Sequence, residues 1–282
     1  CAVLLPPVIG GFVGADTVAC LSATAFDERT KPALMIDIGT NGELALTDGT
    51  RIVSCSTAAG PAFEGANISR GMRASSGAIE HVWLENSELK YKTIGDASPV
   101  GICGSGLIEL AALLSNEDVI EEGGRLAKNG VLGERIITDE TGKPAFIVAE
   151  HDAAGKPILF TQKDVRELQL GKAAMRAGVE TLLDALSLDA SQVEKTLLAG
   201  AFGSHLSPAA LCGIGLLPKE LEAGAESIGN AAGEGAKLYL RNYELFLQTQ
   251  ELAEQTDYIE LTLDKGFTDR YVDAMSFPRE DQ

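Results

Sequence analysis

The sequence predicts an α/β protein with a mixed sheet. Three strand-like apolar stretches follow one another in residues 33–56, joined by the tight turns TNG and DG. After them, strand-like and helical stretches alternate to the end of the chain. Glycine is abundant, with 31 residues, and aromatic residues make up only 5%. This composition suits a fold with many strand-to-helix turns, and the order of elements favours an α/β class.

The first part of the chain is expected to supply the start of the sheet. A short helix is predicted to begin near Asp16. Strands are then predicted at residues 33–38, 43–47 and 51–56, which form consecutive hairpins.

In the middle of the chain, the sequence predicts one helix with a hairpin-rich region before it and another after it. Residues 81–95 read as a β-hairpin, and residues 120–160 as short strands and polar turns that form a small β insertion. Between them, a glycine turn at residues 104–106 leads into a helix with apolar residues at helical spacing.

The last part of the chain is predicted to be mostly helical. The longest helix is expected to follow Thr161 as N-cap and to break near Gly171 or Gly178. A strand and a glycine turn come next, in VEKTLLAGAFGSHL, followed by a helix-rich stretch. A strand at 258–264 and a short helix at 267–278 complete the prediction.

Composition narrows the possible partners. The chain has 41 acidic and 23 basic residues, a net charge of −18, which argues against a nucleic-acid or membrane partner. No apolar run approaches the ~20 residues of a membrane helix. The five cysteines are scattered without a CxxC pair, so we expect reduced thiols and a cytoplasmic protein. The chain begins with Cys1 and is interpreted as a fragment of a longer polypeptide.

The turn in IDIGTNGE is the first candidate site. Asp37 ends a buried strand, which is costly unless the carboxylate is paired or faces a cation. Gly39 and Gly42 leave the backbone open to an anion, and Thr40 and Asn41 add donors. The chemistry indicated is a carboxylate beside Mg²⁺ with phosphates held by the hairpin. The alternative is an ordinary hairpin in which Asp37 caps the turn.

A second candidate is the turn in ICGSGLIE. It lacks the third glycine of a dinucleotide fingerprint, because Glu109 occupies that position. Gly104, Ser105 and Gly106 can still form a nucleotide-contacting helix start. Cys103 is interpreted as a packed small residue.

The third candidate turn lies in LAGAFGSH. Gly200, Ala201 and Gly203 would allow the backbone to approach an adenine or ribose closely. The alternative is plain packing between strand and helix.

Taken together and in this order, the three turns resemble the second half of an acetate/sugar kinase–Hsp70–actin type ATPase. The fold that this implies is an actin/Hsp70/sugar-kinase-like, ribonuclease H-like lobe, with a mixed sheet flanked by helices. The stretches CSTAAGPAFEGANISRGM, FTQKDVRELQLGKAAMRAG and SIGNAAGEGAK narrow the resemblance. With the turns, they resemble the C-terminal domain of the reductive activators of corrinoid proteins, over about residues 5 to 278.

The resemblance implies an ATP-dependent activator that restores Co(II) corrinoid proteins to Co(I). It implies that residues 1–282 form a single C-terminal lobe. The family's N-terminal [2Fe–2S] ferredoxin-like domain, linker and middle region have no counterpart in this sequence. We therefore expect half of an ATP and Mg²⁺ site, a corrinoid protein as partner and a homodimer. Catalytic activity is expected of the longer polypeptide and not of the fragment.

The resemblance also implies roles for particular residues. Asp37 would bind the metal, and either Glu43 or Glu64 would position the hydrolytic water. Residues Ser56, Phe63 and Arg70 are predicted to face the corrinoid partner or the cleft. The remaining cofactor contacts fall in the three turns and are, in chain order, Gly39, Thr40, Asn41, Gly42, Gly104, Ser105, Gly106, Gly200, Ala201, Phe202 and Gly203.

Three other functions remain open from the sequence. One is an activator of a 2-hydroxyacyl-CoA dehydratase. Such an activator carries a [4Fe–4S] cluster between its subunits, and Cys103 beside a glycine turn resembles a ligand of that cluster. Another is a sugar or acetate kinase relative, which needs a substrate pocket from the missing lobe. The third is a non-catalytic nucleotide-binding or interaction module.

Overall fold

The computed structural model describes residues 3–200 and 206–279 and divides into two compact units. The first unit comprises Cys1–Ala58, Ala177–His205 and Glu220–Arg270. The second comprises Ala59–Arg176, Leu206–Lys219 and Tyr271–Gln282. Each unit is described by itself below.

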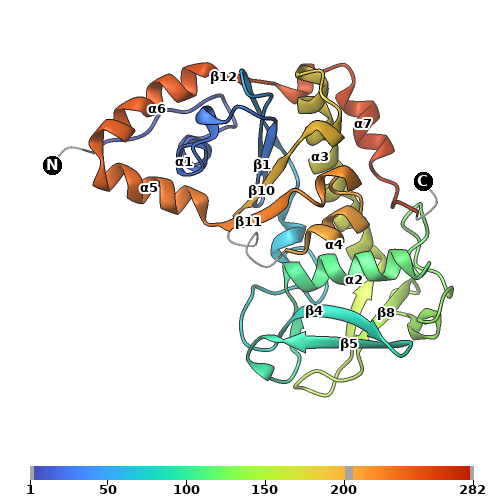
Figure 1. Ribbon diagram of the computed structural model, residues 1–282. Coiled ribbons are helices and arrows are strands. Elements are labelled where there is room, and N and C mark those ends of the chain that lie inside the picture. The colour runs from blue at the N-terminus through green and yellow to red at the C-terminus, as the bar shows by residue number, and fades with distance from the viewer. Residues whose placement is uncertain (1–2, 201–205, 280–282) are drawn as a thin grey trace. The chain divides into compact units, whose positions relative to one another are not determined.

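The first unit is built on a six-stranded sheet (Figure 1). Strands β1 to β3 form two consecutive antiparallel hairpins, while β10, β11 and β12 join them in parallel. The three predicted strands are therefore confirmed. The sheet order is β11-β10-β1-β2-β3-β12. The strands are β1 (Ala33–Ile38), β2 (Gly42–Thr47), β3 (Ile52–Thr57), β10 (Lys195–Ala199), β11 (Ala225–Gly229) and β12 (Thr256–Tyr258).

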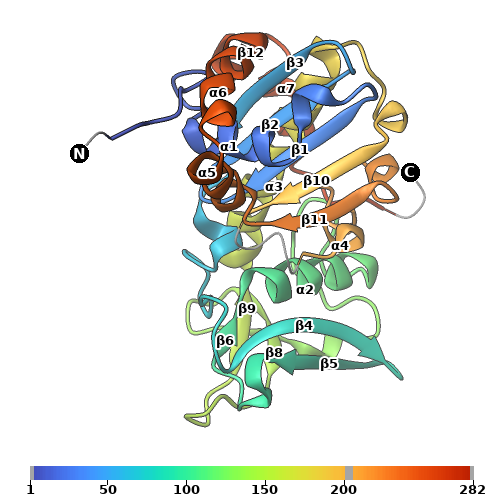
Figure 2. The ribbon, with the colours of Figure 1, turned by 60° about the vertical axis from the view of Figure 1, so that its left-hand side comes forward.

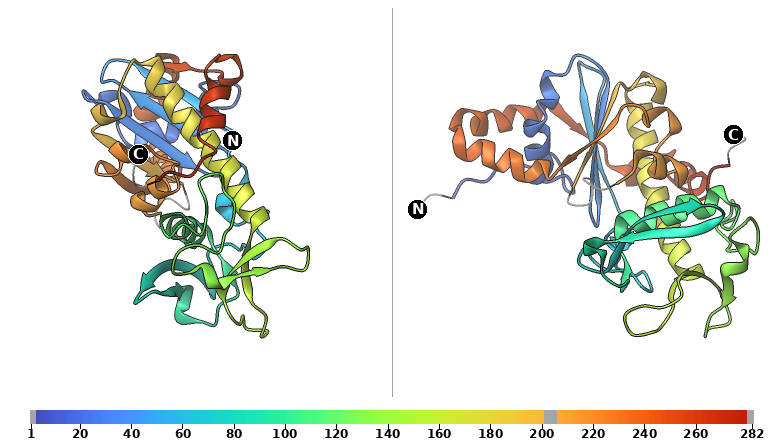
Figure 3. Two further views of the ribbon diagram at one scale, coloured as in Figure 1. Left: turned by 90° about the vertical axis from the view of Figure 1, so that its right-hand side faces the viewer. Right: turned by 60° about the horizontal axis from the view of Figure 1, so that its bottom comes forward.

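Helices cover both faces of this sheet. Helices α1 (Ala15–Ala23), α5 (Ala231–Arg241) and α6 (Tyr243–Gln255) lie together on one face (Figures 1 and 2). The predicted helix near Asp16 is confirmed as α1. On the opposite face, the end of α3 packs closely, because a Cβ on Gly178 would lie 2.5 Å from side-chain atoms of Leu44 and Thr57 (Figure 3).

The second unit holds two small three-stranded sheets and helices α2 (Gly104–Asn116) and α4 (Pro208–Gly213). One sheet has the order β5-β4-β6 and contains the predicted hairpin. The other, β7-β8-β9, is antiparallel and falls in the predicted β insertion. The strands are β4 (Ala78–Glu85), β5 (Glu88–Thr93), β6 (Gly101–Ile102), β7 (Ile136–Thr138), β8 (Pro144–Ala149) and β9 (Ile158–Thr161).

The long helix α3 (Gln162–Ala185) begins as predicted but does not break. The Asp164 amide donates to Thr161 Oγ1 over 3.3 Å, and the Asp164 carboxylate accepts from the Thr161 amide over 2.8 Å, so Thr161 is the N-cap. The predicted break at Gly171 or Gly178 is wrong. A Cβ on Gly171 would lie 2.7 Å from the Ala59 carbonyl, so this glycine allows a close approach to α3.

The sequence-based prediction missed one strand and placed another wrongly. Strand β11 was not predicted, because it lies at the sheet edge, is largely exposed and has no apolar alternation. The strand predicted at 258–264 is wrong: β12 ends at Tyr258, and Leu261–Leu263 is a 3₁₀ turn. The predicted short helix after it is confirmed as α7 (Phe267–Asp273). In the part of the chain that the structure describes, no helix is long and apolar enough to cross a membrane.

Candidate functional site

Three polar side chains lie in a row across the first three strands. Asp37 on β1 is directly opposite Glu43 on β2, and Glu43 is directly opposite Ser56 on β3. Residues opposite each other in antiparallel strands project from the same face of the sheet. The hairpin that carries the predicted phosphate turn therefore carries two carboxylates side by side.

Asp37 is half-buried, and helix α1 approaches it. The Cys20 thiol of α1 donates a hydrogen bond to Asp37 Oδ2 over 3.5 Å. Burial is the main cause that raises the pKa of Asp37, and the nearby charge of Asp16 raises it further, while the bond from Cys20 acts in the opposite direction. Burial therefore disfavours the charged form of this carboxylate, and no basic side chain of the described residues is among the causes that shift its pKa.

Glu43 has a similar environment. Ser56 Oγ donates to Glu43 Oε1 over 3.2 Å, which favours the charged form. Burial outweighs this bond, and with the charges of Asp16 and Asp37 it raises the pKa of Glu43 to about 7. A cation near two half-buried carboxylates would favour their charged forms.

The described residues contain no group of three His, Cys, Asp or Glu side chains that could hold a metal ion by themselves. Mg²⁺ is commonly bound through one or two carboxylates together with water and substrate phosphates. Asp37 is a carboxylate of this kind.

The turn between β1 and β2 is a tight hairpin with an exposed tip. The Gly39 amide donates to the Asn41 carbonyl over 2.9 Å, and Gly42 pairs with Ile38 at the start of β2. Thr40 and Asn41 are exposed at the tip. The hairpin interpretation and the phosphate interpretation are compatible, because the turn is formed without covering its outer face.

The third glycine turn begins beside Asp37. Gly200 follows β10, has φ +102°, and a Cβ there would lie 2.8 Å from Asp37 Oδ1 and 2.7 Å from the Ile38 carbonyl. Only glycine fits this position without strain. The predicted adenosine contacts Ala201, Phe202 and Gly203 lie outside the described residues.

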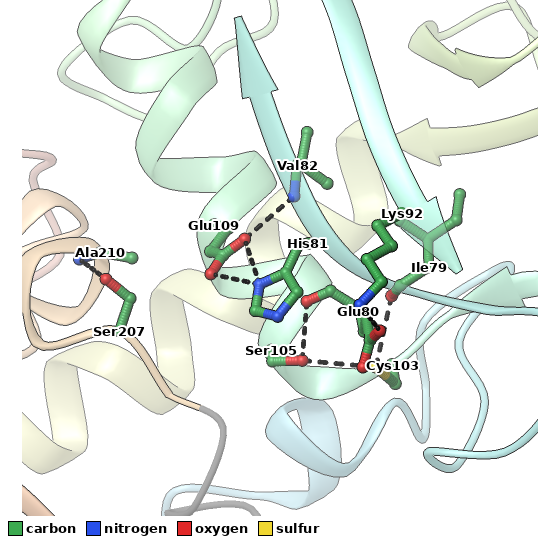
Figure 4. Close-up of polar contacts among 10 residues, drawn as sticks. All are labelled: Ile79, Glu80, His81, Val82, Lys92, Cys103, Ser105, Glu109, Ser207 and Ala210. Atoms are coloured by element: carbon green, nitrogen blue, oxygen red, sulfur yellow. Dashed lines mark hydrogen bonds and ion pairs between the residues drawn. The ribbon is translucent and has the colours of Figure 1, made fainter. Parts of the chain in front are cut away.

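The second glycine turn belongs to the second unit, where it packs α2 on β4 (Figure 4). A Cβ on Gly106 would overlap the Ile79 carbonyl, and Ser105 Oγ donates to the Glu80 carbonyl over 2.9 Å. The Cys103 thiol is buried and donates to the Ile79 carbonyl over 3.3 Å, so the prediction of a packed cysteine is confirmed. Gly104, Ser105 and Gly106 also carry the first amides of α2, which have no acceptor within the helix.

Glu109, which replaces the third glycine of a dinucleotide fingerprint, has a structural role. Its carboxylate accepts from the Val82 amide over 2.9 Å and lies 3.1 Å from His81 Nδ1 (Figure 4). Glu109 therefore links α2 to β4 about one helical turn after the glycine turn.

The three residues predicted to face a partner differ from one another in burial and in contacts. Phe63 is only 1% exposed, and the position of a Cβ on Gly171 is 3.1 Å from its ring, so the prediction of a partner-facing Phe63 is wrong. The sequence missed this core role because the stretch around it has no helical or strand period. Arg70 forms an ion pair with Asp152 and donates to the Val100 carbonyl over 3.1 Å. Ser56 belongs to the carboxylate row.

Two residues near the site were missed from the sequence. Asp16 and Cys20 are four positions apart in α1, and both act on Asp37. Their spacing in DTVAC places them on the same side of a helix, which was a usable signal. What the sequence lacked was the contact between α1 and the end of β1.

A family model of the C-terminal domain of RACo, the ASKHA domain, matches residues 31–282. The chain belongs to this family. As a RACo C-terminal domain it has the ASKHA fold, which confirms the predicted fold class and the resemblance. The order of strands around the β1–β2–β3 hairpins and the flanking helices of the first unit are consistent with that fold.

The chain is also similar to individual proteins whose names fit this family. The chain is 40% identical over 273 residues to "Corrinoid activation enzyme RamQ" of Eubacterium limosum, which covers 94% of this chain. It is 32% identical over 228 residues, or 73% of the chain, to "[Co(II) methylated amine-specific corrinoid protein] reductase" of Methanosarcina barkeri. A solved structure, "Reductive activator for corrinoid,iron-sulfur protein", has a TM-score of 0.88 and 36% identity over 97% of the chain.

The chain spans less than half of the length of each of these relatives. It covers 46% and 38% of the two proteins and 44% of the solved structure. This domain therefore corresponds to one part of longer activators.

Proposed function

We propose that this RACo C-terminal domain is part of an ATP-dependent reductive activator that returns Co(II) corrinoid proteins to Co(I). The observation that carries the proposal is the 40% identity to a corrinoid activation enzyme over 94% of the chain. The similarity to a corrinoid protein reductase and to a reductive activator of known structure supports the same role.

Within such an activator, the first unit would supply part of the ATP and Mg²⁺ site. Asp37 would hold Mg²⁺, and the backbone of Gly39 to Gly42 would face the phosphates. Bound there, Mg²⁺ would neutralise the carboxylate pair and polarise phosphate oxygens. The support is the pairing of Asp37 with Glu43 at the end of a glycine hairpin and the raised pKa of both groups.

Glu43 is the better candidate to orient the hydrolytic water. It lies directly opposite Asp37 and projects from the same face of the sheet. Glu64 belongs to the other unit, in the 3₁₀ turn Pro61–Glu64.

ATP would act through differential binding. Reduction of Co(II) to Co(I) is an uphill step, and a nucleotide can drive it only by binding two states of the activator–partner complex unequally. The electron would come from a [2Fe–2S] domain in the longer polypeptide. A homodimer and a cytoplasmic location complete the proposal.

Calorimetric titration of the chain with Mg-ATP tests the nucleotide site. Asp37→Asn should weaken Mg-dependent binding at least about tenfold, because one charge-assisted ligand is lost. Asp27→Asn is the matched control, since Asp27 is exposed on the 3₁₀ turn Phe26–Glu28. Equal binding by both variants would remove Asp37 from the site.

The activator role is tested separately, with the longer polypeptide that carries this domain. The absorption spectrum of its corrinoid protein should change from Co(II) to Co(I) only with ATP, Mg²⁺ and a reductant. ATP binding without any corrinoid reduction would retain the nucleotide site and reject the activator.

The alternative with a [4Fe–4S] cluster between subunits has less support. Its candidate ligand Cys103 is 2% exposed and hydrogen-bonded inside the second unit. No specific feature of the chain favours a sugar or acetate kinase over a corrinoid activator.

A further inference from the structure

The second unit contains a cavity whose lining differs chemically from the carboxylate row. Its volume is about 460 Å³, within the range of pockets that hold small ligands. Three segments line it: the loop at residues 123–125, the turn before β8, and the first two turns of α3. No residue of this cavity belongs to the motifs assigned above to ATP.

The wall of the cavity is fixed by two glutamines of α3. Gln162 donates to the Gly124 carbonyl over 2.7 Å and accepts from the Leu126 amide over 2.9 Å. Gln169 is 3% exposed and donates to the carbonyls of Gly123 and Met275 over 3.3 and 2.9 Å. These hydrogen bonds hold the loop against the helix.

Gly124 shows how closely this loop approaches the helix. It has φ +83°, and a Cβ there would overlap the amide group of Gln169. A larger residue would push the loop away from α3 and change the cavity. The close approach of this wall to α3 therefore requires glycine at position 124.

The lining of the cavity is strongly basic. Arg125, Lys143, Lys163 and Arg166 all line it, and no carboxylate does. This is unusual in a chain with a net charge of −18. Asp139 interacts with one of these cations: its pKa is lowered mainly by bonds from Thr141 and the Lys143 amide and in a minor way by the Lys143 charge.

Several basic residues elsewhere in the molecule are paired with carboxylates. Lys31, Arg51, Lys195, Lys237 and Arg270 each form an ion pair with a carboxylate. Within residues 3–200 and 206–279, the four side chains of the basic cavity have no ion-pair partner. Four like charges around one cavity repel one another, so a bound anion would relieve an existing electrostatic cost.

We propose that this basic cavity binds a small anion with more than one phosphate group, such as an inorganic or organic diphosphate. Two guanidinium groups match phosphate geometry through paired N–H donors, and two ammonium groups add point charges. A single phosphate carries only about two negative charges, which leaves four cations partly uncompensated. The proposal does not depend on the proposed ATP site or on corrinoid activation.

The test is a calorimetric titration of the full chain with inorganic pyrophosphate at low and moderate salt. Wild type should bind, and the double variant Arg125→Gln/Arg166→Gln should lose affinity at least about tenfold. The matched control Arg51→Gln/Arg241→Gln removes two exposed arginines of the first unit and should bind like wild type. All four side chains are exposed, so both variants should fold, which circular dichroism checks.

A further arm identifies the ligand class. Citrate should bind more weakly than pyrophosphate. The proposal is overturned if wild type does not bind pyrophosphate at millimolar concentration, or if both double variants lose affinity equally. Equal affinity for citrate would reject the phosphate preference.

Discussion

Asp37 and Glu43 lie directly opposite each other across the β1–β2 hairpin and project from the same face of the sheet. A hairpin with no other role would gain nothing from two neighbouring carboxylates, since like charges opposite each other are destabilising. The first three predictions concern the residues that hold this pair and its surroundings in place.

Replacement of Glu43 by Gln should stabilise the protein at neutral and higher pH. The folded-state pKa of about 7 is above the ordinary value of 4.5, so the folded state binds more protons between these values. The free energy of unfolding of wild type therefore falls as pH rises through this window and stays low above it. Glu43→Gln should remove this fall and gain on the order of 2 kcal/mol at pH 8.

Urea unfolding at pH 4.5, 6 and 8 measures this effect. Glu140→Gln is the control, because Glu140 is exposed. A Glu43→Gln variant whose stability relative to wild type does not change with pH would contradict the raised pKa.

Gly200→Ala should destabilise the first unit by about 1–3 kcal/mol, as expected for a strained backbone and a forced contact. The new Cβ would press on the Ile38 carbonyl and Asp37 Oδ1. Gly229→Ala is a matched control, because Gly229 also has positive φ, +62°, but has no atom within 4 Å of its Cβ position. Chemical unfolding should rank Gly200→Ala below Gly229→Ala, and equal losses would show that the contact with Asp37 costs nothing.

Cys20→Ala should weaken the hold of α1 on the carboxylate pair. The variant loses a thiol that donates to Asp37 and that is itself fully buried. Since the bond from Cys20 opposes the raised pKa of Asp37, its loss should raise that pKa further. NMR titration of the Asp37 carboxyl carbon measures the shift, and an unchanged or lower pKa would contradict the bond.

Gly106→Ala tests the packing of α2 on β4. Its Cβ would overlap the Ile79 carbonyl, which belongs to rigid strand backbone, so the expected cost is about 3 kcal/mol. Gly123→Ala is the control in the same unit, since no atom lies within 4 Å of its Cβ position. The prediction fails if thermal unfolding midpoints of the two variants agree.

Lys172→Met tests a buried lysine that holds the end of the second unit. Lys172 Nζ donates to the carbonyls of Ala274 and Ser276 over 2.6 Å each and lies 4.9 Å from the Phe277 ring centre. Burial, with a smaller effect of Arg176, lowers the pKa of Lys172 from 10.5 to about 7. The unfolded state therefore binds more protons between pH 7 and 10.5, and Lys172 makes stability rise with pH across that window.

The variant removes both the bonds and this pH dependence. Its deficit relative to wild type should grow from pH 7 to pH 9.5 by a few kcal/mol, an upper estimate from the pKa shift. Lys128→Met, at an exposed site, is the control. Urea unfolding at the two pH values measures the difference, and a constant deficit would show that Lys172 stays charged in the folded state.

Local signals in the sequence predicted much of the first unit. The strands β1, β2 and β3 are apolar runs separated by TNG and DG, so the pattern and the turn chemistry agree. The start of α3 was equally readable, because the Thr161 cap acts within four residues. The candidate carboxylate Asp37 was visible as a charge at the end of an apolar strand.

The tertiary structure decided what depends on neighbours distant in the chain. Gly171 and Gly178 look like helix breakers, but α3 runs through them because Ala59 and Leu44 approach too closely for a side chain. Phe63 is a core residue only because the loop that carries it folds under α3. The same holds for the basic cavity, whose four cations come from three separate segments. Turns and caps are short-range interactions that a sequence displays directly, whereas burial and charge clusters arise only when distant segments pack together.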